Sequence, residues 1–91
     1  MSVIVRVPAQ LRTLTGGAPE VVLEGSTVGA VLKALDAAHP GFGGRMFDEK
    51  GDLRRFVNVF LVDEDVRFLQ GLETPVVDGQ TLSIVPAVAG G

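Results

Sequence analysis

The residues best suited to chemistry are the last two, Gly90 and Gly91, which end an uncharged stretch that begins at Gly79. A C-terminal carboxylate is unreactive at neutral pH, but its transfer to ATP gives an acyl adenylate with a good leaving group. Attack by a sulfur nucleophile on that adenylate leaves a thiocarboxylate. Gly91 is therefore the residue that we expect to be modified.

The residues before Gly91 suit passage into another protein's active site. From Val85, six further residues reach about 20 Å when extended. Glycine lacks a Cβ atom and can pass through a narrow channel, and an uncharged tail loses little hydration on entering it. We expect Val88, Ala89 and Gly90 to be the residues recognised there.

The rest of the 91-residue sequence offers no second set of reactive side chains. It has no cysteine and a single histidine, His39, which precedes a proline at an expected helix end and is expected at the surface or in a cap. The acidic clusters at residues 48–52 and 63–65 lack the spaced oxygen ligands and distal glutamate of an EF-hand calcium loop. We therefore expect no catalytic residue and no metal site.

Composition narrows the class of protein further. With 46% hydrophobic and 21% charged residues, the chain is expected to form one globular domain. The net charge of −3, without a basic cluster, argues against a nucleic-acid partner. Arg6 interrupts the apolar N-terminal run, and no apolar stretch is long enough to span a bilayer. We expect a cytoplasmic protein with no membrane partner.

Two strands and a helix are predicted in the first half of the chain. Residues 3–7 are mostly β-branched, and a strand there places Val3, Val5 and Val7 on one face. Residues 20–24 are predicted to form the second strand of a β-hairpin, with Val21 and Leu23 facing inward. Ser26 and Thr27 supply the cap of a helix that ends near residues 39–41. Its buried stripe is predicted to comprise Val28, Val31, Leu32, Leu35 and Ala38.

The second half is predicted to hold further strands. Residues 42–52 are expected to be irregular, with a short turn at 45–47. A strand over 56–62 should turn Val57, Val59 and Leu61 inward; a loop at 63–65 and a short return strand at 66–68 follow. A turn at Asp78 and Gly79 leads into a last strand over 81–85.

The order β-β-α-β-(β)-β predicts an α+β fold of the β-grasp (ubiquitin-like) type, with the first and last strands parallel at the sheet centre. Residues 1–85 are the expected domain and 86–91 a flexible tail. One helix covers one sheet face, so the other should be a docking surface; the residues placed on it are Ile4, Arg6, Val22, Phe60, Val62 and Val85. Two alternatives are that loops cover part of this face, or that the register differs by one residue.

Three segments resemble one known family. They are RFVNVFLVDEDVRF (residues 55–68), DGQTLSIVPAVAGG (78–91) and LRTLTGG (11–17). Over its whole length the chain is similar to the ThiS/MoaD-type sulfur carriers, and within them it most resembles the CysO-like carriers of cysteine biosynthesis.

The resemblance implies a carrier acted on by other enzymes. An adenylating enzyme related to ubiquitin E1 and MoeB would use ATP to activate Gly91, with Gly90 as its required neighbour, and a rhodanese-type donor would supply sulfur. A PLP-dependent cysteine synthase and a JAMM-type zinc peptidase would follow in the CysO-like pathway. The carrier itself would bind no cofactor. Phe60, Val85 and Arg6 are the docking residues that we expect on its outer sheet face.

Other functions remain open at this point. A MoaD-like carrier for molybdopterin synthesis ends in a similar pair of glycines, although the chain is longer than typical ThiS. A ubiquitin-like modifier begins with the same adenylate but ends in an isopeptide bond to a lysine. A plain β-grasp binding module would have an incidental tail.

Overall fold

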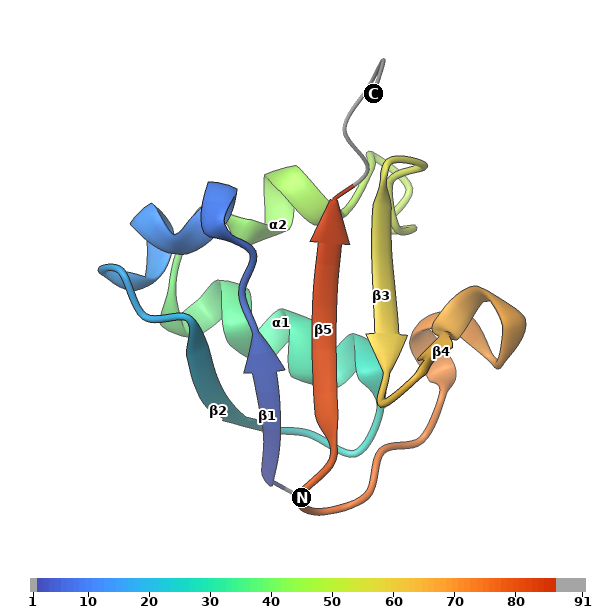
Figure 1. Cartoon of the computed structure of the whole chain (residues 1–91). Coiled ribbons are helices and arrows are strands. Elements are labelled where there is room, and N and C mark those ends of the chain that lie inside the picture. The colour runs from blue at the N-terminus through green and yellow to red at the C-terminus, as the bar shows by residue number, and fades with distance from the viewer. Residues whose placement is uncertain (1, 87–91) are drawn as a thin grey trace.

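The computed structural model describes residues 2–86, which form a five-stranded mixed sheet with one main helix across one face (Figure 1). The elements, in chain order, are β1 (Ser2–Arg6), the 3-10 helix η1 (Ala9–Thr15), β2 (Glu20–Glu24), α1 (Val28–Ala38), α2 (Phe42–Met46), β3 (Val57–Leu61), β4 (Glu64–Asp65), the 3-10 helices η2 (Val66–Phe68) and η3 (Gly71–Glu73), and β5 (Thr81–Pro86).

The strand order is β2-β1-β5-β3-β4, and this arrangement confirms the predicted β-grasp fold. β1 and β5 lie parallel at the centre, with Val5 opposite Leu82. The other pairs are antiparallel, with Val3 opposite Leu23 and Val59 opposite Ile84. The first and last strands can be parallel because the whole intervening chain forms the crossover.

α1 begins and packs as its sequence predicts, except at its end. The Thr27 hydroxyl oxygen accepts a hydrogen bond from the Ala30 amide at 3.1 Å, which is a standard N-cap. The predicted stripe residues are fully buried apart from Ala38, which is exposed. Placing Ala38 in the stripe was therefore wrong: it is the last residue of α1, and its side chain faces solvent.

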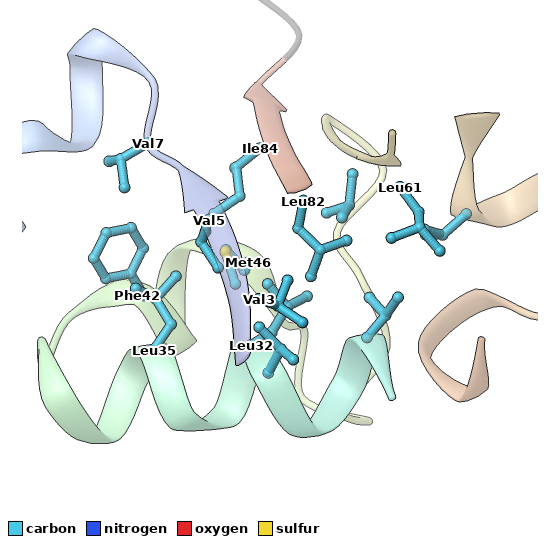
Figure 2. Close-up of a cluster of buried hydrophobic side chains, with 14 of the residues drawn as sticks. Val3, Val5, Val7, Leu32, Leu35, Phe42, Met46, Leu61, Leu82 and Ile84 are labelled. Carbon is cyan, nitrogen blue, oxygen red and sulfur yellow. The ribbon is translucent and has the colours of Figure 1, made fainter. Parts of the chain in front are cut away.

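The core lies between α1 and the inward faces of the strands (Figure 2). Side chains of alternate strand residues, including Val3, Val5 and Leu82, meet Leu32 and Leu35 there. On β3 the residues predicted to face inward are buried, so the alternative of a one-residue register shift is excluded. β3 itself is shorter than predicted, since residues 56 and 62 lie outside it.

A helix replaces part of the predicted irregular segment. α2 spans Phe42–Met46 and buries both terminal side chains in the core. Gly41 precedes it with φ of 115°, a conformation that side chains other than glycine rarely adopt. The sequence pattern missed this helix because one turn containing two glycines has low helix propensity, and burial of its two ends stabilises it instead.

The segment after β3 also differs from the prediction. The return strand is Glu64–Asp65, inside the predicted loop, and residues 66–68 form η2 rather than a strand. The Asp65 carboxylate accepts a hydrogen bond from the Arg67 amide at 2.9 Å, and this local bond favours the turn over strand pairing.

Candidate functional site

The end of β5 is the point from which the predicted tail leaves the domain. β5 continues through Pro86, which pairs with Val57, one residue beyond the predicted end of the domain. In Figure 1 the C-terminal end of β5 lies at the same end of the domain as η1 and α2. The predicted tail residues Val88, Ala89, Gly90 and Gly91 lie outside the residues that the structure describes.

The hydrogen-bond pattern explains why a proline is accepted within this central strand. The Val62 amide donates to the Thr81 carbonyl oxygen at 2.9 Å, so alternate residues of β5, Ser83 and Val85, turn their polar backbone groups toward β3. Pro86 lies one position further and faces the other way, where β1 has already ended at Arg6. The missing N–H therefore removes no hydrogen bond from the sheet.

The three predicted docking residues share the sheet face opposite α1. Arg6 lies opposite Ser83, and Ser83 lies opposite Phe60, so one row crosses β1, β5 and β3. Val85 follows two residues after Ser83 on the same face, opposite Asn58. The structure thus places Arg6 and Val85 on the same sheet face, although they are 79 positions apart in the sequence.

This face is apolar and accessible in part. The exposed fractions of Val22, Val62 and Val85 are 66%, 54% and 44%, whereas Ile4 and Phe60 are half-buried. These exposures argue against the alternative that loops cover the face. The surface can therefore contact a partner through aliphatic and aromatic groups.

Charged groups at the two ends of this face are held differently. The Arg6 guanidinium lies 3.6 Å from the Glu20 carboxylate in an exposed ion pair near the end of β5. At the opposite end, the Ser2 hydroxyl donates to the Glu24 carboxylate and holds the pKa of Glu24 below its ordinary value. Exposed ion pairs contribute little stability, so Arg6 can exchange Glu20 for another carboxylate at small cost.

The remaining candidate residues have structural roles. The His39 amide donates to the Leu35 carbonyl oxygen at 2.8 Å and caps the end of α1, the kind of role expected for it. The Asp48 carboxylate accepts from the Lys50 and Asp52 amides at 2.9 and 3.0 Å, which closes a turn. Within residues 2–86, no three histidine or acidic side chains gather as a metal site would require.

The sequence did not predict that three arginines would lie on one surface of the domain. Arg12, Arg45 and Arg54 all line clefts at the end of β5. Arg54 precedes β3 in the chain, and Arg45 lies on the helix that the pattern missed. Arginines that are far apart in the sequence give no local signal that they share a surface.

In residues 2–86, none of the helices has the length and apolar character needed to span a bilayer.

Comparisons with known proteins give consistent matches. The model of the ThiS family matches residues 5–91. The sulfur carrier protein CysO of Mycobacterium tuberculosis is 47% identical over 93 residues, covering 100% of both chains. A chain in the crystal structure of the Amycolatopsis orientalis BexX/CysO complex has a TM-score of 0.91 and 48% identity, over 98% of this chain and 99% of that one. Small archaeal modifier protein 3 of Haloferax volcanii is 39% identical over 66 residues, 72% of this chain and 71% of that protein.

Proposed function

The chain belongs to the ThiS family and is a sulfur carrier rather than an enzyme, and we propose that Gly91 is the residue that carries the sulfur. The observation that supports this assignment is the match to CysO over the full length of both chains, together with a family match that runs through Gly91. Partner enzymes recognise the folded domain and perform each chemical step on Gly91.

The first step forms a mixed anhydride. A carboxylate oxygen of Gly91 attacks the α-phosphorus of ATP, pyrophosphate leaves, and the acyl adenylate remains. This step belongs to an adenylating enzyme of the E1/MoeB type, which binds the ATP; the carrier holds no cofactor of its own. The apolar outer face with Phe60, Val85 and Arg6 is the surface that docks on this enzyme.

The second step replaces AMP by sulfur. Hydrosulfide attacks the carbonyl carbon, AMP leaves, and the product is a thiocarboxylate. A rhodanese-type persulfide donor reaches the same product by way of an acyl disulfide, which a second thiol reduces. Val88, Ala89 and Gly90 are the residues that fit the channel of each partner, since their side chains are small or absent and uncharged.

The sulfur acceptor that we propose is a PLP-dependent cysteine synthase, with a JAMM-type zinc peptidase releasing the product from the tail. The similarity to CysO carriers over the full length of both chains supports this proposal. A MoaD-like role in molybdopterin synthesis is the competing acceptor. Offering the thiocarboxylate to each synthase in turn and measuring which one consumes it distinguishes the two.

The test of the carrier function is an intact mass after incubation with ATP, an E1/MoeB-type enzyme and sulfide. We expect a mass increase equal to the replacement of one oxygen by sulfur, localised to the terminal peptide. Deletion of Gly91, or addition of one residue after it, should abolish the shift. An unchanged mass with an enzyme that modifies its own known carrier would contradict the proposal.

Protein modification is a second candidate, favoured by the similarity to an archaeal modifier protein. The same adenylate would then end as an isopeptide bond to a lysine. Larger species that contain this chain, detected by denaturing electrophoresis of cells expressing a tagged form, would support it. A carrier that only donates sulfur stays near its own mass.

A further inference from the structure

A second accessible surface lies at the end of β5, on the side of the sheet that carries the helices. It is a cleft of about 320 Å³. Its apolar lining comes from η1 and from inward-facing or terminal residues of β3 and β5, and comprises Leu11, Val57, Ile84 and Pro86. Val57 and Ile84 point to the opposite side of the sheet from Phe60 and Val85, so this cleft is separate from the outer docking face.

Two arginines and an exposed aromatic ring complete the cleft. Arg45 lies in α2, and Arg54 precedes β3; both are exposed. The Arg54 Nε donates to the Gly44 carbonyl oxygen at 3.0 Å, which holds its guanidinium beside α2. Phe56 is 60% exposed. No acidic side chain lines this cleft, and Arg54 also lines a neighbouring cleft with Asp48, Glu49 and Lys50.

Positive charge also lines the other side of the same strand end. A second cleft of about 460 Å³ shares Ile84 and contains Arg6 and Arg12. The Arg12 Nε donates to the Val7 carbonyl oxygen at 3.1 Å. The two clefts together place four arginines around the end of β5. The lining of the second cleft also includes one acidic residue, Glu20.

The far end of the sheet has the opposite charge. The Asp78 carboxylate accepts a hydrogen bond from the Ser2 amide at 2.7 Å, and the Glu24 carboxylate accepts one from the Ser2 hydroxyl. Asp63 and Glu64 follow the far end of β3. In a protein of net charge −3, four arginines thus lie near the end of β5, where Glu20, Asp48 and Glu49 offset part of their charge. The positive charge of the cleft that contains Arg45 and Arg54 favours an anionic partner surface there.

We propose that the cleft formed by Arg45, Arg54 and Phe56 binds an acidic segment of the adenylating enzyme, with an apolar side chain of that segment seated on the cleft floor. This inference rests on the proposed function. Five residues follow Pro86 and reach about 18 Å when extended, so an enzyme that modifies Gly91 has to face the end of β5. Carboxylates on that enzyme pair with the two guanidinium groups, which favour planar, bidentate partners.

Paired substitutions test this cleft. Arg45→Glu and Lys33→Glu change the net charge equally at exposed helical positions, but Lys33 lies on α1 away from the cleft. Phe56→Ala and Phe68→Ala each remove an exposed ring, and Phe68, which is 85% exposed, lies in η2. The measurement is kcat/KM for ATP-dependent thiocarboxylation, followed by intact mass, at low and high salt.

We expect Arg45→Glu and Phe56→Ala each to lower kcat/KM by about tenfold at low salt, mainly through KM because neither side chain takes part in the reaction of Gly91. The effect of Arg45→Glu should shrink at 0.5 M salt, where the screening length falls to roughly 4 Å. Lys33→Glu and Phe68→Ala should stay within about twofold of the wild type.

Three outcomes would overturn the inference. Equal losses for Arg45→Glu and Lys33→Glu would mean that net charge matters and the cleft does not. Wild-type rates for both cleft variants would mean that the enzyme does not contact it. A concentration-dependent dimer that Arg45→Glu dissociates would assign the cleft to a second copy of the chain. In each case the wild type still gains sulfur, whereas failure of the proposed function would leave the wild type itself unmodified.

Discussion

Replacement of Phe42 by alanine tests whether α2 is anchored in the core, because Phe42 is completely buried there. Its ring lies near Leu35 and Val7 in Figure 2. Truncation of a buried phenylalanine to alanine removes the transfer free energy of the ring and leaves a cavity. Together these effects cost about 3–5 kcal/mol in proteins with well-packed cores.

That cost is a large share of the total stability of such a domain. At about 0.05–0.15 kcal/mol per residue, a chain of 91 residues has a free energy of unfolding of roughly 5–14 kcal/mol. Each kcal/mol shifts the thermal midpoint of a domain this size by about 4–8 °C. We therefore expect Phe42→Ala to lower Tm by roughly 12–40 °C while leaving a folded protein at low temperature.

The assay is urea and thermal unfolding followed by circular dichroism, with an unchanged urea m-value as the sign that both states keep their exposed surface. Phe56→Ala is the matched control, since its ring is 60% exposed, and it should cost less than about 1 kcal/mol. A loss below about 1 kcal/mol for Phe42→Ala would refute the reasoning. The position of Arg45 beside the end of β5 would then lose its support, because α2 holds it there.

Three further predictions concern the sheet. Val62 is a β-branched residue at φ of 59° with 54% of its surface exposed, so Val62→Gly should relieve strain and raise the free energy of unfolding by about 1 kcal/mol, measured by urea unfolding; a decrease would show that side-chain packing outweighs the strain. Glu24 should titrate below 4.5 in an NMR experiment, and Ser2→Ala should raise its pKa by removing the hydroxyl donor. Because the folded-state pKa is the lower one, the stability that Glu24 contributes is present above pH 4.5 and is lost as pH falls through the folded value; an unchanged pKa in Ser2→Ala would contradict this cause. Phe60→Ser should weaken binding to the adenylating enzyme and cost less than about 2 kcal/mol in unfolding, whereas a larger loss would place Phe60 in the core rather than on a docking face.

Much of the fold follows from local patterns in the sequence. Alternation identifies β1, β2, β3 and β5, and the helical spacing with Thr27 as cap identifies α1. Together with the chain order, these elements allow few topologies, since parallel terminal strands need a crossover that covers one sheet face. The apolar residues of the outer face were also predictable, because a strand places alternate side chains on opposite faces.

The elements that the patterns missed are short and depend on distant contacts. α2 has a single turn and two glycines, so burial of Phe42 and Met46 stabilises it more than its own propensity does. Glu64–Asp65 pairs with the end of β3 because a tight turn at Val62 brings it back. No local pattern in either segment outweighs these contacts.

The chemistry proposed for the tail depends on the sequence alone, because the glycine pair and the absence of charge can be read without any coordinates. The arginine-lined surface at the end of β5 is a property of the tertiary structure. Arg6, Arg12, Arg45 and Arg54 lie in four separate segments of the chain. Strand pairing of β1 and β3 with β5, and the burial of α2, bring them to one end of the domain. Local sequence determines which side chains are available, whereas register and core packing decide which of them become neighbours.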